Sequence, residues 1–287
     1  MSERDHGADV QPSSEAQFLD EMDPQLAGWA DPKARLYQAL KRNELVLYGQ
    51  LILNLQDMRF AMAEVLVRLR EEEAALLPPG EFLPVFELYH MLPDLDRWVV
   101  ANVVMQLARG SRIARLGINV SSQSLEDPGF AKFIADTLVT ASVPSTSLVF
   151  EIAESDVLFR LEHAARFAAA VRAIGCAVTI DGFGSRAVSF APLKTLRADF
   201  LKVDGSIVRN ILRSPIALSK LGAILRVGKT IGTDVIAEFV EDQDVLMRLK
   251  ALGVPYAQGF GIHEPCPMAK LLGKPIDASS PGEAGRV

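Results

Sequence analysis

Ala177-Val178-Thr179-Ile180-Asp181 is the stretch that decides the fold, because it is a short β-type run that ends in an acid and follows an amphipathic segment, 162–174. The same order recurs along most of the chain. An amphipathic helix followed by a short apolar strand is typical of parallel βα units. The other helix and strand pairs are predicted at 95–108 and 116–119, 130–141 and 148–151, 193–197 and 200–202, 219–231 and 235–238, and 245–252 and 256–258.

The chain before these units contains a further helix and two strands. Residues 34–43 are predicted to be a helix, and residues 44–48 a strand that leads to Gln50. Residues 59–69 are apolar on alternate positions around Glu64, and the following residues, 71–80, are predicted to be a loop. So many units over roughly 240 residues favour a TIM-like (β/α)8 barrel over an open sheet.

The composition predicts one folded domain with a polar segment at each end. The chain has 287 residues, 49% of them hydrophobic. Seven acidic residues and a single basic residue, Arg4, fall within the first 30 residues, and this excess equals the whole net charge of −6. We expect residues 1–32 to be an acidic, disordered tail, residues 33–275 to form the barrel, and residues 276–287 to be a flexible tail.

The charge and hydropathy patterns argue against several classes of protein. Outside the acidic tail the charges balance, so no DNA- or RNA-binding surface is expected. The sequence has no run of about 18 apolar residues, so no membrane span is expected. The first 20 residues are acidic and polar, unlike a secretory signal. We therefore expect a cytoplasmic protein in which Cys176 and Cys266 are reduced thiols.

Polar residues at the ends of the predicted strands indicate a site. In a barrel of this kind the C-terminal ends of all the strands meet at one mouth, where active sites are assembled. Four carboxylates with an asparagine, a lysine and a glutamine facing one cavity indicate a site for a hard cation and a phosphate substrate. These seven residues are Glu64, Asn119, Glu151, Asp181, Lys202, Glu238 and Gln258.

The same positions lie in motifs that resemble the EAL family, phosphodiesterases that open the bacterial second messenger cyclic di-GMP. The resemblance covers roughly residues 33 to 270 and also implies the TIM-like barrel. The matching stretches are Glu64-Val65-Leu66 for E-A-L, Asn119-Val120-Ser121 for N-x-S, Glu151-Ile152-Ala153-Glu154 for E-x-T-E, Ile180-Asp181-Gly182-Phe183-Gly184 for I-D-D-F-G, Leu201-Lys202-Val203-Asp204 for L-K-I-D, Glu238-Phe239-Val240-Glu241 for E-G-V-E, and Gln258-Gly259-Phe260 for Q-G-Y/F.

The resemblance implies a metal site and the groups that serve the attacking water. The cofactor would be Mg²⁺ or Mn²⁺. Lys202 would position or activate the water, and Gln258 would hold the water network. Glu238 would complete the set through the metal or its water. The implied metal ligands are Glu64, Asn119, Glu151 and Asp181, with Glu238.

The resemblance also implies the groups that contact the nucleotide. Gln50 and Leu66 would lie near it, and Arg68 would grip a phosphate, since a guanidinium donates two parallel hydrogen bonds. Asp96 and Glu241 would meet the guanine bases, because a carboxylate can accept two hydrogen bonds from a guanine edge. A further residue, Glu154, would anchor the loop that follows the second aspartate of the I-D-D-F-G motif.

The departures from the family pattern cluster in one loop. Gly182 replaces the second aspartate, so a ligand shared by the two metal ions is missing, and one ion or none is expected. Arg186 stands where the family has a glycine. Three functions stay open: a cyclic di-GMP receptor with weak or no hydrolysis, which we favour; an active phosphodiesterase producing linear pGpG; and a nucleotide-independent interaction module. A protein partner and a homodimer also stay open.

Overall fold

The computed structural model describes residues 29, 31–42, 44–70, 76–185, 190 and 192–271. Most of the predicted N-terminal tail and all of the predicted C-terminal tail lie outside these residues. The acidic run Glu71-Glu72-Glu73 and the Arg186 loop position also lie outside them.

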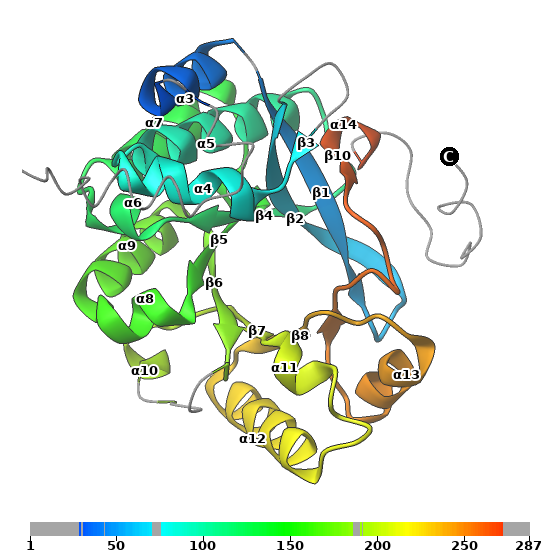
Figure 1. Ribbon diagram of the computed structural model, residues 1–287. Coiled ribbons are helices and arrows are strands. Elements are labelled where there is room, and N and C mark those ends of the chain that lie inside the picture. The colour runs from blue at the N-terminus through cyan, green and yellow to red at the C-terminus, as the bar shows by residue number, and fades with distance from the viewer. Residues whose placement is uncertain are drawn as a thin grey trace, which may run out of the picture.

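Within the described residues, eight strands close into a barrel that helices surround, which confirms the predicted TIM-like fold (Figure 1). The strands follow the order β1-β9-β8-β7-β6-β5-β4-β2, and pairing of β2 with β1 closes the ring. Two short strands, β3 (Leu76–Leu77) and β10 (Cys266–Pro267), pair with β2 and β1. The barrel strands are β1 (Leu45–Asn54), β2 (Arg59–Arg70), β4 (Arg115–Val120), β5 (Leu148–Ala153), β6 (Ala177–Phe183), β7 (Phe200–Val203), β8 (Asp234–Ala237) and β9 (Tyr256–Ala257).

One strand of the barrel runs opposite to the other seven. β1 runs antiparallel to β2, with Gln50 opposite Glu64, and antiparallel to β9, with Leu53 opposite Ala257. The chain between β1 and β2 is a tight turn in which Met58 has a φ of 57°. So short a connection joins antiparallel strands only, because parallel strands need a long crossover. The hairpin places Gln50 beside Glu64.

The predicted helices are present, with bounds that differ by a few residues. The predicted loop through Pro79 and Gly80 is wrong, because α4 begins at Pro79, and proline is favoured in the first turn of a helix. The helices are α3 (Pro32–Lys41), α4 (Pro79–Leu88), α5 (Leu92–Ala108), α6 (Ser122–Glu126), α7 (Phe130–Ala141), α8 (Glu154–Phe159), α9 (Leu161–Ile174), α10 (Leu193–Leu196), α11 (Gly205–Val208), α12 (Pro215–Ile231), α13 (Gln243–Ala251) and α14 (Met268–Leu271), with the 3₁₀ turn η1 (Ser145–Ser147).

The unit made of α9 and β6 shows how the sequence builds each repeat. α9 ends at Gly175, whose φ of 102° is a left-handed conformation that glycine adopts without strain. The Cys176 amide then donates to the Val171 carbonyl at 3.0 Å, and β6 starts at the next residue. The stop signal therefore sets where Asp181 lies on β6, two residues before the strand ends at Phe183.

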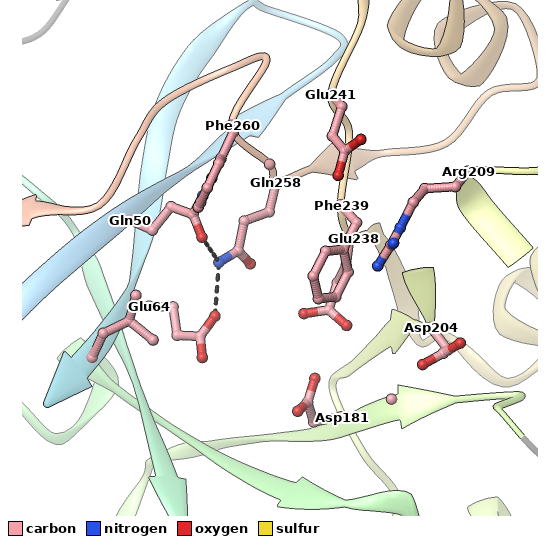
Figure 2. Close-up of a pocket in the computed structure, with 13 residues that line it drawn as sticks. Gln50, Glu64, Asp181, Asp204, Arg209, Glu238, Phe239, Glu241, Gln258 and Phe260 are labelled. Carbon is pink, nitrogen blue, oxygen red and sulfur yellow. Dashed lines mark hydrogen bonds between the residues drawn. The ribbon is translucent and has the colours of Figure 1, made fainter. Parts of the chain in front are cut away.

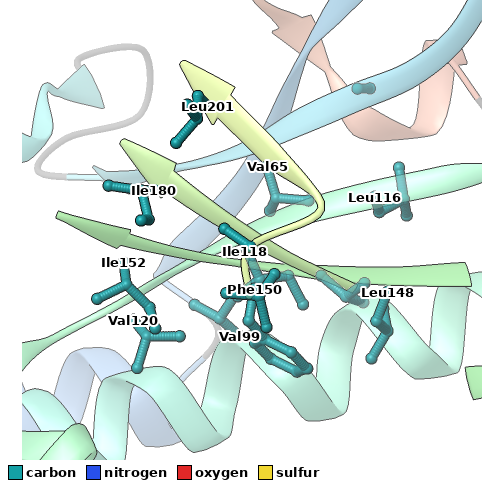
Figure 3. Close-up of a cluster of buried hydrophobic side chains, with 14 of the residues drawn as sticks. Val65, Val99, Leu116, Ile118, Val120, Leu148, Phe150, Ile152, Ile180 and Leu201 are labelled. Carbon is teal, nitrogen blue, oxygen red and sulfur yellow. The ribbon is translucent and has the colours of Figure 1, made fainter. Parts of the chain in front are cut away.

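Side chains alternate along each strand between the face that packs against the helices and the face that points into the barrel. In β5, Phe150 and Ile152 are buried between barrel and helices (Figure 3). The ring of Phe150 meets that of Phe167 on α9 edge to face, with the ring centres 5.6 Å apart. Glu151, between Phe150 and Ile152, points to the opposite face. A second, smaller apolar cluster therefore lies inside the barrel, beneath the site. Its members are Ile52, Met62, Val149, Phe200 and Ile236.

Candidate functional site

The charged residues of the site lie two residues further along their strands than members of the inner apolar cluster. Met62 precedes Glu64 by two residues, and Phe200 precedes Lys202 by two, so each pair shares a face of its strand. The same spacing joins Val149 to Glu151 and Ile236 to Glu238. The closed, apolar floor of the barrel thus directs the charged side chains towards the C-terminal mouth.

Lys202 lies at the centre of the charged groups. Its Nζ is 2.8 Å from an oxygen of Glu64 and 2.8 Å from one of Glu151. Glu238 lies 3.1 Å away and Asp181 3.6 Å away. These four carboxylates come from or directly follow four different strands, β2, β5, β8 and β6. The structure therefore brings together all the predicted charged metal ligands around one buried ammonium group.

The pKa shifts follow from burying more acids than bases. Burial raises the pKa of Glu151 to about 8, although Lys202 opposes the shift. Burial also raises the pKa of Glu238 to about 7. Burial acts in the same direction on Glu64, but Lys202 and three hydrogen bonds outweigh it and lower that pKa. The pKa of Lys202 is raised well above its usual value by its acidic neighbours, against the effect of burial. Four acids therefore share one base, and Glu151 and Glu238 hold their protons to higher pH than ordinary carboxyl groups do.

Amide side chains fix the orientation of Glu64. Gln258 Nε2 donates to Glu64 at 2.7 Å and to Gln50 Oε1 at 3.0 Å, while Asn119 Nδ2 donates to the other Glu64 oxygen at 2.9 Å. Gln50 in turn donates to the His263 carbonyl at 3.0 Å. Both Gln50 and Gln258 are buried. The hairpin and β9 thus bring two predicted residues, Gln50 and Gln258, into the network around Glu64.

A cavity of about 520 Å³ opens above these residues (Figure 2). It contains several of the predicted site residues at its wall. Asn119, Glu151 and Lys202 do not line it. Asn119 bonds to Glu64, and Lys202 bonds to Glu64 and Glu238, which do line it, while Glu151 bonds to Lys202. The lining residues are Gln50, Glu64, Leu66, Asp181, Gly182, Asp204, Arg209, Glu238, Phe239, Glu241, Gln258, Gly259 and Phe260.

Two predicted nucleotide-binding residues lie away from this cavity. The Arg68 guanidinium donates to the Val67 carbonyl at 2.8 Å and lies over the ring of Tyr48, 5.6 Å from its centre. Asp96, on α5, accepts hydrogen bonds from the backbone amide and the hydroxyl of Ser121 at 2.9 and 2.7 Å. Both side chains therefore have structural contacts of their own, and their roles in binding remain predictions.

The predicted loop anchor, Glu154, contacts the loop itself. It accepts hydrogen bonds from the Gly184 amide at 3.0 Å and the Ser185 hydroxyl at 3.2 Å. Glu154 is buried, and it begins α8 directly after β5. The start of the loop after β6 is thus tied to the neighbouring βα unit.

Four side chains that line the cavity had not been assigned a role from the sequence. Three of them lie within the quoted motifs: Asp204, Phe239 and Phe260. Phe239 replaces a glycine of the family pattern, and this departure could have identified it as a site residue. Arg209 lies five residues after Asp204, outside any motif, and no sequence signal identified it. The two phenylalanines are 49% and 66% exposed, so the mouth carries two accessible aromatic rings.

The oxygen atoms of the site's carboxylate and amide side chains suit one divalent ion better than two. Oxygens are the hard ligands that Mg²⁺ and Mn²⁺ prefer. The buried Oδ1 atom of Asp181 has no hydrogen-bond partner among the described residues. As the side chains lie, no three acidic, His or Cys groups in the described chain are arranged to hold an ion. Lys202 occupies the space between the acids, and Gly182 offers no carboxylate for a second ion.

Comparisons with known proteins agree with this geometry. The EAL domain family model matches residues 33–265. The cyclic di-GMP phosphodiesterase PdeB of Shewanella oneidensis is 31% identical over 84% of this chain and 28% of its own length. PdeF of Escherichia coli is 30% identical over 83% of this chain. The chain spans about a third of the length of such curated relatives, between 28% and 35%.

Solved structures give the same result over nearly their whole length. The FimX EAL domain from Pseudomonas aeruginosa, bound to c-di-GMP, is 32% identical, with a TM-score of 0.77 over 82% of this chain and 96% of that one. The FimX EAL domain of Xanthomonas citri, in complex with c-di-GMP, is 28% identical, with a TM-score of 0.77 over 88% and 96%. The family match, the barrel and the convergence of the motif residues on one mouth establish that this chain belongs to the EAL domain family.

Proposed function

We propose that this protein binds cyclic di-GMP at the mouth of the barrel and hydrolyses it weakly or not at all. It would act as a receptor in cytoplasmic bacterial second-messenger signalling. Two EAL domains that share its fold at 28% and 32% identity are bound to c-di-GMP. A cavity of about 520 Å³ at the mouth provides a place for such a ligand.

The cavity walls suit a dinucleotide. Phe239 and Phe260 present exposed rings, and stacking of a base on an aromatic ring contributes about 1–3 kcal/mol. Glu241, also at the wall, has two carboxylate oxygens that can accept hydrogen bonds from a guanine edge. These groups bind the ligand without taking part in bond cleavage, so the loss of a metal ligand would leave them intact.

Gly182 is the single observation that carries the receptor assignment. It lies beside Asp181 at the cavity wall and supplies no carboxylate. Loss of one ligand shared by two metal ions is expected to cost about 3–4 kcal/mol of transition-state stabilisation, roughly 10²–10³ in rate. Hydrolysis therefore suffers far more than binding.

The residues present fit a single divalent ion, and Glu64, Asn119, Glu151 and Asp181 would hold it, with Glu238 close by. When bound, such an ion supplies a Lewis acid and an activated water. The chain itself supplies orientation: Gln258 and Asn119 hold both oxygens of Glu64, and Lys202 holds the acids together. The inner apolar cluster closes the barrel below them and excludes water from that side.

A working phosphodiesterase is the second candidate. The observation that favours it is the retention of four carboxylates, Lys202 and Gln258 in one connected network. Binding alone does not require such a network. One ion on these residues would give slow, metal-dependent opening of the cyclic dinucleotide to linear pGpG.

Two measurements on the same purified chain test the proposal. Calorimetry with cyclic di-GMP in EDTA measures binding, and chromatography after incubation with Mn²⁺ measures pGpG. A receptor binds in EDTA and forms no pGpG over hours. Formation of pGpG that disappears in Glu64→Ala would show an enzyme, because Glu64 lies at the centre of the network. Absence of both binding and product would leave the interaction module.

A further inference from the structure

The cavity presents an electrostatic problem for any phosphate ligand. Five carboxylates line it, and a cyclic dinucleotide adds two phosphodiester charges. Lys202 lies beneath, with its ammonium held by acids, so it cannot reach upward without breaking those contacts. Among the described residues that line the cavity, Arg209 is the single basic one.

Arg209 is placed to face a ligand. It follows the last residue of α11, and its Cζ lies 4.6 Å from the centre of the Phe239 ring (Figure 2). Within the described part of the chain no ion pair or hydrogen bond of its side chain is found. Its guanidinium donors are therefore open to the cavity, while the ring of Phe239 supports one face of the group.

The backbone holds Phe239 in the position that supports Arg209. Phe239 has a φ of 53°, a left-handed conformation that is uncommon for a bulky residue. Its ring packs on Gly205, where an added Cβ would lie 2.4 Å from Phe239 Cδ2. The absence of a side chain at Gly205 thus gives the ring its place, and the strained backbone at Phe239 is a feature typical of functional sites.

We propose that Arg209, supported by Phe239, donates hydrogen bonds to a phosphate of the bound cyclic dinucleotide. The inference rests on the proposed function, and it adds a ligand-binding residue that lies outside the family motifs. Arg68, the arginine that the motifs single out, does not line the cavity, and its guanidinium donates to the Val67 carbonyl and lies over the Tyr48 ring. A guanidinium suits the role because its fork donates two parallel hydrogen bonds to phosphate.

Calorimetry with cyclic di-GMP in EDTA tests the assignment without turnover. Arg209→Ala is expected to weaken binding at least ten-fold, and Arg209→Lys to recover part of the loss, since lysine keeps the charge but not the fork. Arg213→Ala is the matched control, because Arg213 is an exposed arginine on the same segment that does not line the cavity. It should stay within two-fold of wild type.

Arg209 is exposed, so its removal should leave thermal unfolding unchanged, and a drop in affinity will not reflect misfolding. Wild-type binding should also weaken more steeply with added salt than binding by Arg209→Ala. Equal affinities of wild type and Arg209→Ala would overturn the assignment, as would equal losses in Arg209→Ala and Arg213→Ala. Failure of the wild type to bind at all would overturn the proposed function and this assignment together.

Discussion

Gly182 shows how much chemistry can depend on one side chain. Its φ is 66°, and a Cβ built there would meet no atom within 4 Å. The position therefore has room for a side chain, and Asp and Asn tolerate this backbone conformation better than other non-glycine residues. The missing carboxylate is thus not imposed by packing, and a single substitution can return it.

Gly182→Asp is expected to increase Mn²⁺-dependent formation of pGpG by roughly ten- to a thousand-fold, because it restores an acid beside Asp181. Chromatography of the products measures the change. Gly182→Asn is the control, since it has the same shape without the charge and should leave the rate near that of wild type. Equal rates in wild type and Gly182→Asp would mean that another feature limits hydrolysis.

A second glycine, Gly117 on β4, makes space for the buried carboxylate of Glu151. A Cβ there would lie 2.0 Å from Glu151 Oε1, and Lys202 holds that carboxylate in place. Gly117→Ala is expected to destabilise the fold by about 1–3 kcal/mol, as overpacking does. Urea unfolding measures it. In Gly222→Ala, within α12, the nearest atom is an arginine nitrogen at 3.5 Å, so a gain of about 0.5–1 kcal/mol is expected.

At the scale of single residues, the sequence predicted the charged centre better than its rim. Glu64, Glu151 and Lys202 lie on barrel strands, and strand residues that point inward at the mouth must converge wherever the loops go. Arg209 is different, because it reaches the cavity from a turn whose path depends on tertiary packing. Arg68 is another case: a motif singles it out, its side chain contacts Tyr48 in this structure, and its role in binding stays a prediction.

At the scale of elements, β7 acts as the connector of the mouth. Its Lys202 contacts acids from β2, β5 and β6 and the residue after β8. Four carboxylates this close repel one another, and the ammonium offsets that repulsion. The contacts that join these five strands at the mouth therefore depend on the buried charge of Lys202.

Lys202→Met is expected to destabilise the protein by about 3–5 kcal/mol in EDTA, because it leaves buried acids without a partner. Excess Mn²⁺ should recover part of the loss by supplying another cation for the same acids. Thermal and urea unfolding measure both effects. Lys194→Met, at an exposed position of α10, is the control and should change little. A Lys202→Met variant as stable as wild type in EDTA would contradict this account.

Asp96 links α5 to the start of α6 through Ser121, and it makes this junction sensitive to pH. Burial raises the pKa of Asp96 above its ordinary value of 3.8, although the bonds from Ser121 oppose the shift. The folded state therefore holds the proton more tightly than the unfolded state. The contribution of Asp96 to stability is greatest below a pH of about 4 and falls as pH rises through the folded pKa.

Asp96→Asn removes this titration. Relative to the variant, the wild type is expected to lose unfolding free energy as the pH is raised from about 4 to about 7. Urea unfolding at several pH values measures the difference. A stability difference between the two proteins that does not vary with pH would reflect changed hydrogen bonding alone and would refute the shifted titration.

The elements also show where reading a pattern from sequence fails. The helix and strand pairs from residue 95 onward were predicted because the period of hydrophobicity changes between them. The hairpin of β1 and β2 has the same strand pattern, and alternation alone carries no direction. Only the short turn ending at Met58 makes the pair antiparallel.

At the scale of the whole molecule, every wall of the cavity belongs to the closed barrel or to a segment attached to it. The described chain has no helix long and apolar enough to cross a membrane. The cavity is lined from β1 and β2, from β6, from the residues that flank α11 and from the segments after β8 and β9, so a ligand there contacts both halves of the chain. Binding is therefore expected to stabilise the barrel as a unit.

Cyclic di-GMP at about 100 times its dissociation constant should add about 2.7 kcal/mol of stability, which for a domain of this size raises the Tm by about 5–10 °C. Thermal unfolding in EDTA measures the shift. In a receptor the shift persists after hours with Mn²⁺, because the ligand is not consumed. In Gly182→Asp it should decay during the same incubation as pGpG accumulates. A wild-type shift that decays with Mn²⁺ but persists in EDTA would identify the protein as an enzyme despite Gly182.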